Sequence, residues 1–138
     1  MKTLYQTSAS VTGGRNGKVT SEDGILELEV RTPKELGGQT GYTNPEQLFA
    51  AGYAACFDSA LNLIMSQAKV KPESPSHVKA SVSLGTNETG GYQLAVTLAV
   101  QIPGIEKEQA LELVNKAHEV CPYSNATRGN IDVQLEII

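Results

Sequence analysis

A long apolar segment beginning at Asn44 is the feature that most constrains how this chain of 138 residues folds. Asn44 is a good N-cap, Pro45 suits the first helical position, and Gln47 can complete a capping box three residues after the cap. Two prolines downstream stop a helix at about Lys69. The sequence therefore predicts one helix of more than twenty residues, close to the middle of the chain.

This predicted helix is apolar on most of its sides. Its only charge between Leu48 and Leu61 is Asp58. A helix of this kind is buried in the centre of a structure, and its small residues let another backbone approach closely. Because so short a chain has few large side chains to cover it, we expect a second copy to supply the rest, as a homodimer. The two apolar stripes are Leu48, Gly52, Ala55, Cys56, Ser59 and Leu63 on one face, and Phe49, Tyr53, Phe57, Ala60 and Ile64 on the next.

Alternating apolar and polar residues on both sides of the helix predict strands. Three are expected before it and three after it, with a second helix starting at Glu106 whose apolar stripe ends at Cys121. The predicted order is β-β-β-α-β-β-α-β in one α+β domain spanning residues 1–138, with antiparallel sheets. The predicted strands are residues 3–11, 18–22, 25–32, 77–85, 92–102 and 130–138, and a short polar segment precedes the last of them.

Composition excludes several classes of function. A net charge of −4, with no basic cluster interleaved with aromatic residues, argues against nucleic-acid binding. No long uncharged apolar run or apolar leader is evident, so we expect a cytoplasmic protein without a membrane segment. With 5% aromatic residues and no Trp, the core must be mainly aliphatic.

The two cysteines, Cys56 and Cys121, lie 65 positions apart, so they form no C-x-x-C motif. A permanent structural disulfide is not expected in a reducing compartment. Two interpretations stay open on residue type alone. Both thiols could be inert core residues, since free cysteine is among the most buried residue types. Alternatively, they could form a pair that cycles between thiols and a disulfide.

A reactive Cys56 needs a cation, because it lies too far along its helix for the dipole to help and apolar neighbours raise a thiol pKa. Arg15, in a glycine-rich turn, is one candidate, and Glu46 could hold that guanidinium. Ten residues, or about 15 Å of helix rise, separate Glu46 from Cys56, so the carboxylate would act only through the arginine. The plainer alternative makes Arg15 an exposed turn residue and Glu46 an acid that complements the helix dipole.

The two histidines suggest little more. His77 and His118, together with the two cysteines, match no zinc-ligand spacing, so we expect no metal. His118 precedes Cys121 by three positions and could share a helix face with it, but a nucleophile pair of that type has no recognisable third group.

Two segments resemble a known family. Asn44-Pro45-Glu46 followed by Phe-Ala-Ala-Gly-Tyr-Ala-Ala-Cys-Phe at residues 49–57, and Val-Cys-Pro-Tyr-Ser-Asn-Ala-Thr-Arg-Gly-Asn at residues 120–130, are similar to the organic hydroperoxide resistance (Ohr) proteins, a branch of the OsmC-like superfamily. The resemblance covers essentially the whole chain. It implies an intertwined homodimer in which sheets wrap two central helices.

By this resemblance Cys56 takes the place of the peroxidatic cysteine and Cys121 that of the resolving cysteine. Arg15 takes the place of the arginine that activates the thiolate, and Glu46 that of the carboxylate that orients the arginine. Asn16 departs from the aspartate often found after that arginine, which puts only a charge at position 16 in doubt.

The activity that the resemblance implies is reduction of an organic hydroperoxide, alkyl or fatty-acid, to an alcohol. The reaction would pass through a Cys56 sulfenic acid and an intrachain disulfide. It implies no bound cofactor, and an external dithiol, a dihydrolipoyl group on a lipoylated carrier protein, would reopen the disulfide. Three alternatives remain: an OsmC-type peroxidase of broader substrate range, a non-catalytic redox-sensing or ligand-binding protein on the same fold, and a protein whose two cysteines only pack.

Overall fold

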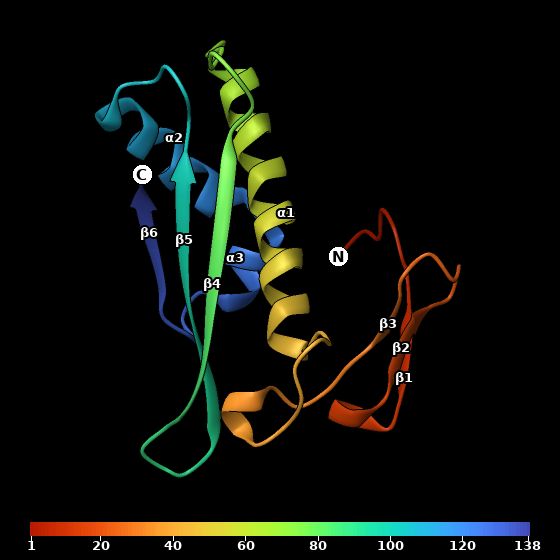
Figure 1. Ribbon diagram of the computed structural model, residues 1–138. Coiled ribbons are helices and arrows are strands. Elements are labelled where there is room, and N and C mark those ends of the chain that lie inside the picture. The colour runs from red at the N-terminus through yellow and green to blue at the C-terminus, as the bar shows by residue number, and fades with distance from the viewer. The chain divides into compact units, whose positions relative to one another are not determined.

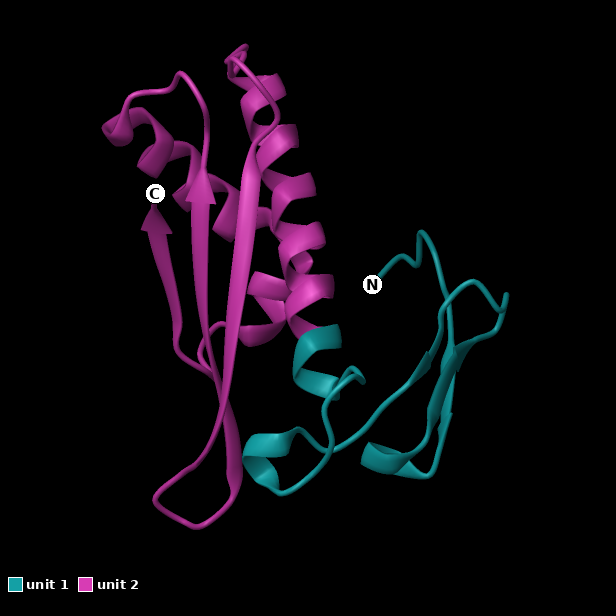
Figure 2. Cartoon of the chain, viewed as in Figure 1, with its two compact units in different colours: residues 1–48 teal, residues 49–138 magenta.

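The computed structural model describes residues 1–138 and contains the predicted elements in the predicted order, with additions (Figure 1). The chain forms two compact units, residues 1–48 and 49–138, and each is described by itself (Figure 2). The elements are β1 (Ala9–Thr12), β2 (Lys18–Ser21), β3 (Glu27–Glu29), α1 (Pro45–Gln67), β4 (His77–Thr86), β5 (Tyr92–Gln101), α2 (Lys107–Val120), α3 (Pro122–Thr127) and β6 (Val133–Ile137), with short 3-10 turns at Gly14–Asn16 and Lys34–Leu36.

The first unit is an antiparallel sheet in the order β1-β2-β3. Val19 pairs with Val11 on one side and with Leu28 on the other, which places these three apolar side chains on one face. The strand predicted at residues 3–11 is shorter than expected and begins only at Ala9. The reason is the partner strand: β2 ends at Ser21, where a turn begins, so residues 3–8 have no strand to pair with.

The turn between β1 and β2 depends on Gly17. A Cβ at this position would overlap the carbonyl oxygen of Thr12 and lie 2.9 Å from the Cα of Gly13. Both are backbone atoms, which cannot rotate away as a side chain can. Gly17→Ala is therefore expected to cost about 3 kcal/mol of unfolding free energy, measured by urea denaturation. Gly85→Ala is the matched control, because nothing lies within 4 Å of a Cβ there. Equal effects of the two substitutions would contradict this account.

Helix α1 begins where the capping pattern predicts. The side-chain oxygen of Asn44 accepts a hydrogen bond from the backbone N–H of Gln47 at 2.9 Å, which confirms the N-cap. The Gln47 side chain does not close the predicted capping box, because its oxygen accepts a hydrogen bond from the hydroxyl of Thr43 instead. The helix ends at Gln67, two residues before the predicted limit, and Lys69 then adopts a positive φ of 56°.

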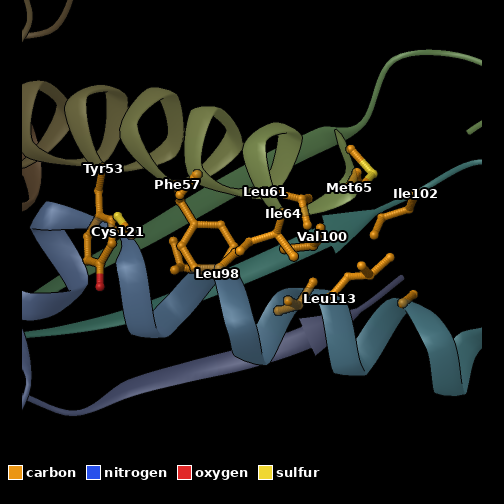
Figure 3. Close-up of a cluster of buried hydrophobic side chains, with 14 of the residues drawn as sticks. Tyr53, Phe57, Leu61, Ile64, Met65, Leu98, Val100, Ile102, Leu113 and Cys121 are labelled. Atoms are coloured by element: carbon orange, nitrogen blue, oxygen red, sulfur yellow. The ribbon is translucent and has the colours of Figure 1, made fainter. Parts of the chain in front are cut away.

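The apolar stripe of α1 that contains Tyr53, Phe57 and Ile64 is buried, together with the neighbouring Leu61 (Figure 3). These side chains pack against β5 and α2 in the core of the second unit. The other stripe is largely open, and Leu63 on it is 52% exposed. By length and composition α1 could also cross a membrane, a property that it shares with the core helices of soluble proteins. Cover by a second copy of the chain stays a prediction.

The second unit has a mixed sheet, in the order β4-β5-β6. The β4-β5 hairpin is antiparallel, as predicted, but β6 runs parallel to β5, with Val96 opposite Val133. The expectation of antiparallel sheets is therefore wrong for this strand. The parallel pairing follows from the helical connection between the two strands. Helices α2 and α3 carry the chain back to the end of the sheet where β5 begins, and such crossovers join parallel strands. Val96, Leu98 and Val100 of β5 are buried against the helices.

Helix α3 occupies the segment predicted only as polar. It follows α2 directly, and Cys121 separates the two helices. Pro122 stands at the first helical position, where proline is favoured because its missing N–H is not needed there. This signal was available in the sequence. The chain order is thus β-β-β-α-β-β-α-α-β rather than the predicted order with a single helix after β5.

Candidate active site

The two cysteines meet inside the second unit. Cys56, on α1, and Cys121, between α2 and α3, have their sulfur atoms 3.6 Å apart, and both are free thiols. Cys121 is fully buried, whereas Cys56 is partly exposed. A disulfide needs a sulfur–sulfur distance of about 2.05 Å, so closure requires one sulfur to move by about 1.5 Å. The fold thus brings two side chains that are 65 positions apart in the sequence into direct contact.

Different neighbours of Cys56 shift the pKa of its thiol in opposite directions. Burial raises the pKa of Cys56, whereas a hydrogen bond from the backbone N–H of Tyr123 lowers it by stabilising the thiolate. The nearby Cys121 raises this pKa further, because two thiolates at this distance would repel each other. Of the two sulfurs, the partly exposed one of Cys56 is the one that a solute can reach.

The contribution of Tyr123 could not be read from the sequence. Its ring rests on Gly52, where a Cβ would lie 3.1 Å from the phenolic oxygen and 3.3 Å from Cε2. Gly52 stands one helical turn before Cys56, so the absence of a side chain there lets α3 approach α1 closely. The rings of Phe49 and Tyr53 lie 6.3 Å and 5.8 Å from that of Tyr123, which gives this region an aromatic border.

The first unit holds the other two predicted site residues as a pair. Arg15 lies in the 3-10 turn Gly14–Asn16, and Glu46 in the first turn of α1. Their side chains form two parallel hydrogen bonds, from Nη1 to Oε2 at 2.8 Å and from Nη2 to Oε1 at 2.5 Å. This bidentate geometry suits a guanidinium and a carboxylate. The predicted partnership between Arg15 and Glu46 is therefore present, while the roles of both in catalysis stay predictions.

The Arg15 guanidinium lowers the pKa of Glu46, against a smaller opposing effect of burial. The resulting stabilisation is fully present above the unfolded value near 4.5 and is lost as pH falls through the lower folded pKa. Because the Arg15 side chain is 39% exposed, solvent screens the pair, and Glu46→Gln should cost only about 1 kcal/mol at pH 7. Urea unfolding measures this cost, which should decrease as the pH falls below 4.5.

The exposed pair Lys18–Glu27 provides the control for that measurement, since both side chains are more than half exposed. Glu27→Gln should change the unfolding free energy by less than about 0.5 kcal/mol at pH 7 and at pH 3. A loss in Glu46→Gln that persists unchanged at pH 3 would contradict the assignment of the effect to this ion pair.

The two histidines belong to no cluster of potential metal ligands in the structure. No group of three or more His, Cys, Asp or Glu side chains lies close enough to hold a metal ion. His118, near the end of α2, makes a 2.8 Å contact through Nδ1 with the hydroxyl of Ser124. Burial lowers the pKa of His118, and the charge of Arg128 lowers it further, so the imidazole is neutral near pH 7.

Comparison with known proteins assigns the chain to a family. The OsmC-like protein family matches residues 37–136. An organic hydroperoxide resistance protein of Xanthomonas axonopodis pv. citri is 50% identical over 137 residues, which cover 99% of this chain and 96% of the relative. The organic hydroperoxide resistance protein OhrB of Bacillus subtilis is 48% identical over 136 residues, with coverage of 97% and 98%.

Solved structures agree with these sequence relatives. The crystal structure of an organic hydroperoxide resistance protein from Elizabethkingia anophelis, with thiocyanate bound, has a TM-score of 0.94 at 58% identity and covers 99% of this chain and 98% of its own. The crystal structure of OhrB of Bacillus subtilis has a TM-score of 0.89 at 47% identity, with coverage of 99% and 100%. The chain therefore belongs to the OsmC-like protein family, and within it to the organic hydroperoxide resistance proteins.

Proposed function

We propose that this protein is a thiol-dependent peroxidase that reduces organic hydroperoxides to alcohols. The observation that carries the proposal is the 3.6 Å separation of the Cys56 and Cys121 sulfurs, one partly exposed and one buried. A purely packing role does not require the two sulfurs, 65 positions apart in the sequence, to lie this close with one of them partly exposed. The names of the relatives, which refer to organic hydroperoxide resistance, agree with the proposal.

In the proposed reaction the Cys56 thiolate attacks the terminal oxygen of the hydroperoxide. The O–O bond breaks, the alkoxide takes a proton and leaves as an alcohol, and Cys56 becomes a sulfenic acid. The Cys121 sulfur then attacks the Cys56 sulfur, which forms the disulfide and releases water. An external dithiol reduces this disulfide by exchange and is itself oxidised to a disulfide. One hydroperoxide and one dithiol are consumed in each cycle.

Arg15 and Glu46 have proposed roles in the first step. A buried thiol needs a nearby cation to ionise, and arginine stays charged when it is removed from water. Arg15 is proposed to stabilise the Cys56 thiolate and the developing charge on the leaving oxygen. Glu46 is a positioning residue, which holds the guanidinium through the two hydrogen bonds described above.

The expected substrate is an alkyl or fatty-acid hydroperoxide rather than hydrogen peroxide. The partly exposed ring of Tyr123 lies against Gly52, one helical turn before Cys56, and the ring of Phe49 lies 6.3 Å from it; these two rings would remove a hydrocarbon tail from water favourably. The remaining parts of the proposal are a dihydrolipoyl group on a lipoylated carrier as the dithiol, a homodimer that covers the open stripe of α1, and a cytoplasmic location.

Steady-state peroxide consumption tests the proposal. The protein is mixed with dihydrolipoamide and with either cumene hydroperoxide or hydrogen peroxide at the same concentration. A kcat/KM at least about tenfold higher for the alkyl substrate is expected, since the tail adds favourable burial. Equal values would favour the OsmC-type enzyme of broader range. A disulfide that forms without sustained consumption would favour a redox sensor.

A further inference from the structure

A network of hydroxyl groups lies in the core beside the two cysteines, and the reaction scheme above does not use it. The phenolic oxygen of Tyr53 lies 3.0 Å from the hydroxyl of Ser124 and 3.1 Å from that of Thr127. The Ser124 hydroxyl also contacts Nδ1 of His118 at 2.8 Å. Ser124 is fully buried and Thr127 is 6% exposed, so these polar groups have only each other and the backbone as partners.

Because each hydroxyl has only one proton, the donor and the acceptor of every hydrogen bond in the network can be assigned. The Thr127 hydroxyl donates to the carbonyl oxygens of Tyr123 and Ser124, which can only accept. Thr127 therefore accepts from Tyr53, Tyr53 accepts from Ser124, and Ser124 accepts from His118. Every contact is satisfied if the neutral imidazole carries its proton on Nδ1. Such a one-way chain holds each hydroxyl in a single orientation.

The network joins the three helices that carry the reacting groups. Tyr53 lies three positions before Cys56 on α1, His118 three positions before Cys121 on α2, and Ser124 three positions after Cys121 on α3. Each of these residues is about one helical turn from a cysteine. The same helix, α3, also places the N–H of Tyr123 against the Cys56 sulfur. Figure 3 shows Tyr53 on the side of α1 that faces α2 and Cys121.

We propose that the chain of hydrogen bonds from His118 through Ser124 and Tyr53 to Thr127 is a positioning network that keeps the Cys56 and Cys121 sulfurs at closing distance. None of these four side chains makes a hydrogen bond to either sulfur, so their proposed action is to hold the three helices that place the two cysteines. The part of this inference that concerns the reaction with peroxide rests on the proposed function. The positioning of the two thiols can be tested whether or not the protein reduces peroxides.

The consequence concerns the competition that follows formation of the Cys56 sulfenic acid. Closure requires a displacement of about 1.5 Å along a defined direction, and misplacement of reacting groups by about 1 Å can slow a reaction by about a hundredfold. While closure is slow, a second hydroperoxide can oxidise the sulfenic acid to sulfinic acid and release another alcohol. The network therefore protects the enzyme from over-oxidation by keeping closure faster than this second attack.

The test uses two substitutions that each remove one hydroxyl, Tyr53→Phe and Ser124→Ala, and Thr127→Val as a third if either fails to fold. Tyr92→Phe is the matched control for the loss of a phenolic hydroxyl, because Tyr92 is 82% exposed. Val100→Ala is the control for a general loss of stability, because it removes buried carbon atoms of β5 and no hydrogen bond. Melting temperature is measured for every variant.

The first readout needs no peroxide. Each protein is equilibrated with mixtures of reduced and oxidised glutathione, and the effective concentration of one cysteine toward the other is obtained from the fraction of Cys56–Cys121 disulfide. We expect a decrease of about tenfold or more in both network variants. Tyr92→Phe is expected to match the parent, and Val100→Ala to lose melting temperature with little change in effective concentration.

The second readout is rapid-quench oxidation with cumene hydroperoxide, which separates sulfenic acid formation from disulfide closure. Closure is expected to slow by about tenfold and sulfinic acid to accumulate in the network variants, with the first step changed less than about threefold. Effective concentrations within twofold of the parent in the network variants would overturn the inference. It would also be overturned if Val100→Ala lost effective concentration as the network variants do, so that the decrease simply followed the loss of melting temperature. If the parent protein is inert to cumene hydroperoxide but the glutathione result is as expected, the proposed function fails and the positioning network stands.

Discussion

Replacing Cys56 with serine is expected to abolish hydroperoxide consumption, with a loss in kcat/KM of at least about a thousandfold. The substitution exchanges one atom at a partly exposed position, so the fold should be retained. A serine hydroxyl is far less ionised and less nucleophilic than a thiol, and it forms no sulfenic acid. Consumption of cumene hydroperoxide with dihydrolipoamide in excess measures the effect.

The control for that experiment is a serine substitution outside the pair of cysteines that keeps both thiols. Ala55→Ser, at the exposed neighbouring position of α1, is suitable and should leave consumption close to that of the parent. Turnover by Cys56→Ser at more than about a tenth of the parent rate would show that the peroxide reacts elsewhere, and the assignment of Cys56 would have to be abandoned.

Replacing Cys121 with serine is expected to divide the cycle between its two steps. The first reduction of hydroperoxide should persist as a burst of about one alcohol per Cys56, within about threefold of the parent rate, because the attacking sulfur is unchanged. Sustained turnover should decrease by about a hundredfold, since no intrachain disulfide can form for the dithiol to reduce. Rapid-quench kinetics followed by mass spectrometry measures both steps.

The fate of Cys56 in Cys121→Ser is the diagnostic observation. Without a resolving thiol, its sulfenic acid should be oxidised to sulfinic acid as the hydroperoxide concentration increases, which adds two oxygen atoms in total. The parent protein treated in parallel should show the disulfide instead. Unchanged sustained turnover in Cys121→Ser would mean that the dithiol reduces the sulfenic acid directly and that Cys121 has no resolving role.

The sequence predicted the central helix well because its signals are local. The N-cap at Asn44, the proline after it and the apolar spacing act within a few residues of one another, and α1 begins and ends close to the predicted limits. The α+β class followed from the same kind of signal. The motifs around Cys56 and Cys121 identified the family, which the comparisons confirm.

What the sequence missed depends on partners far away in the chain. The parallel pairing of β6 with β5 is decided by where two helices return the chain, which alternation alone does not show. The hydrogen bond from Tyr123 to Cys56 comes from a backbone N–H, which every residue except proline carries. The spacing along α1 places Tyr53 in an apolar stripe and gives no sign of its hydroxyl partner Ser124, which lies 71 positions away.

The most direct test of the central claim is oxidation of the fully reduced protein with one equivalent of cumene hydroperoxide, followed by thiol counting and peptide mass mapping. The account predicts rapid loss of both thiols, one cumyl alcohol per chain, and a Cys56–Cys121 linkage within a single chain. Survival of both thiols would contradict it. The two cysteines, although 3.6 Å apart, would then be packing residues of the core, and the chain would share the fold of its family without this chemistry.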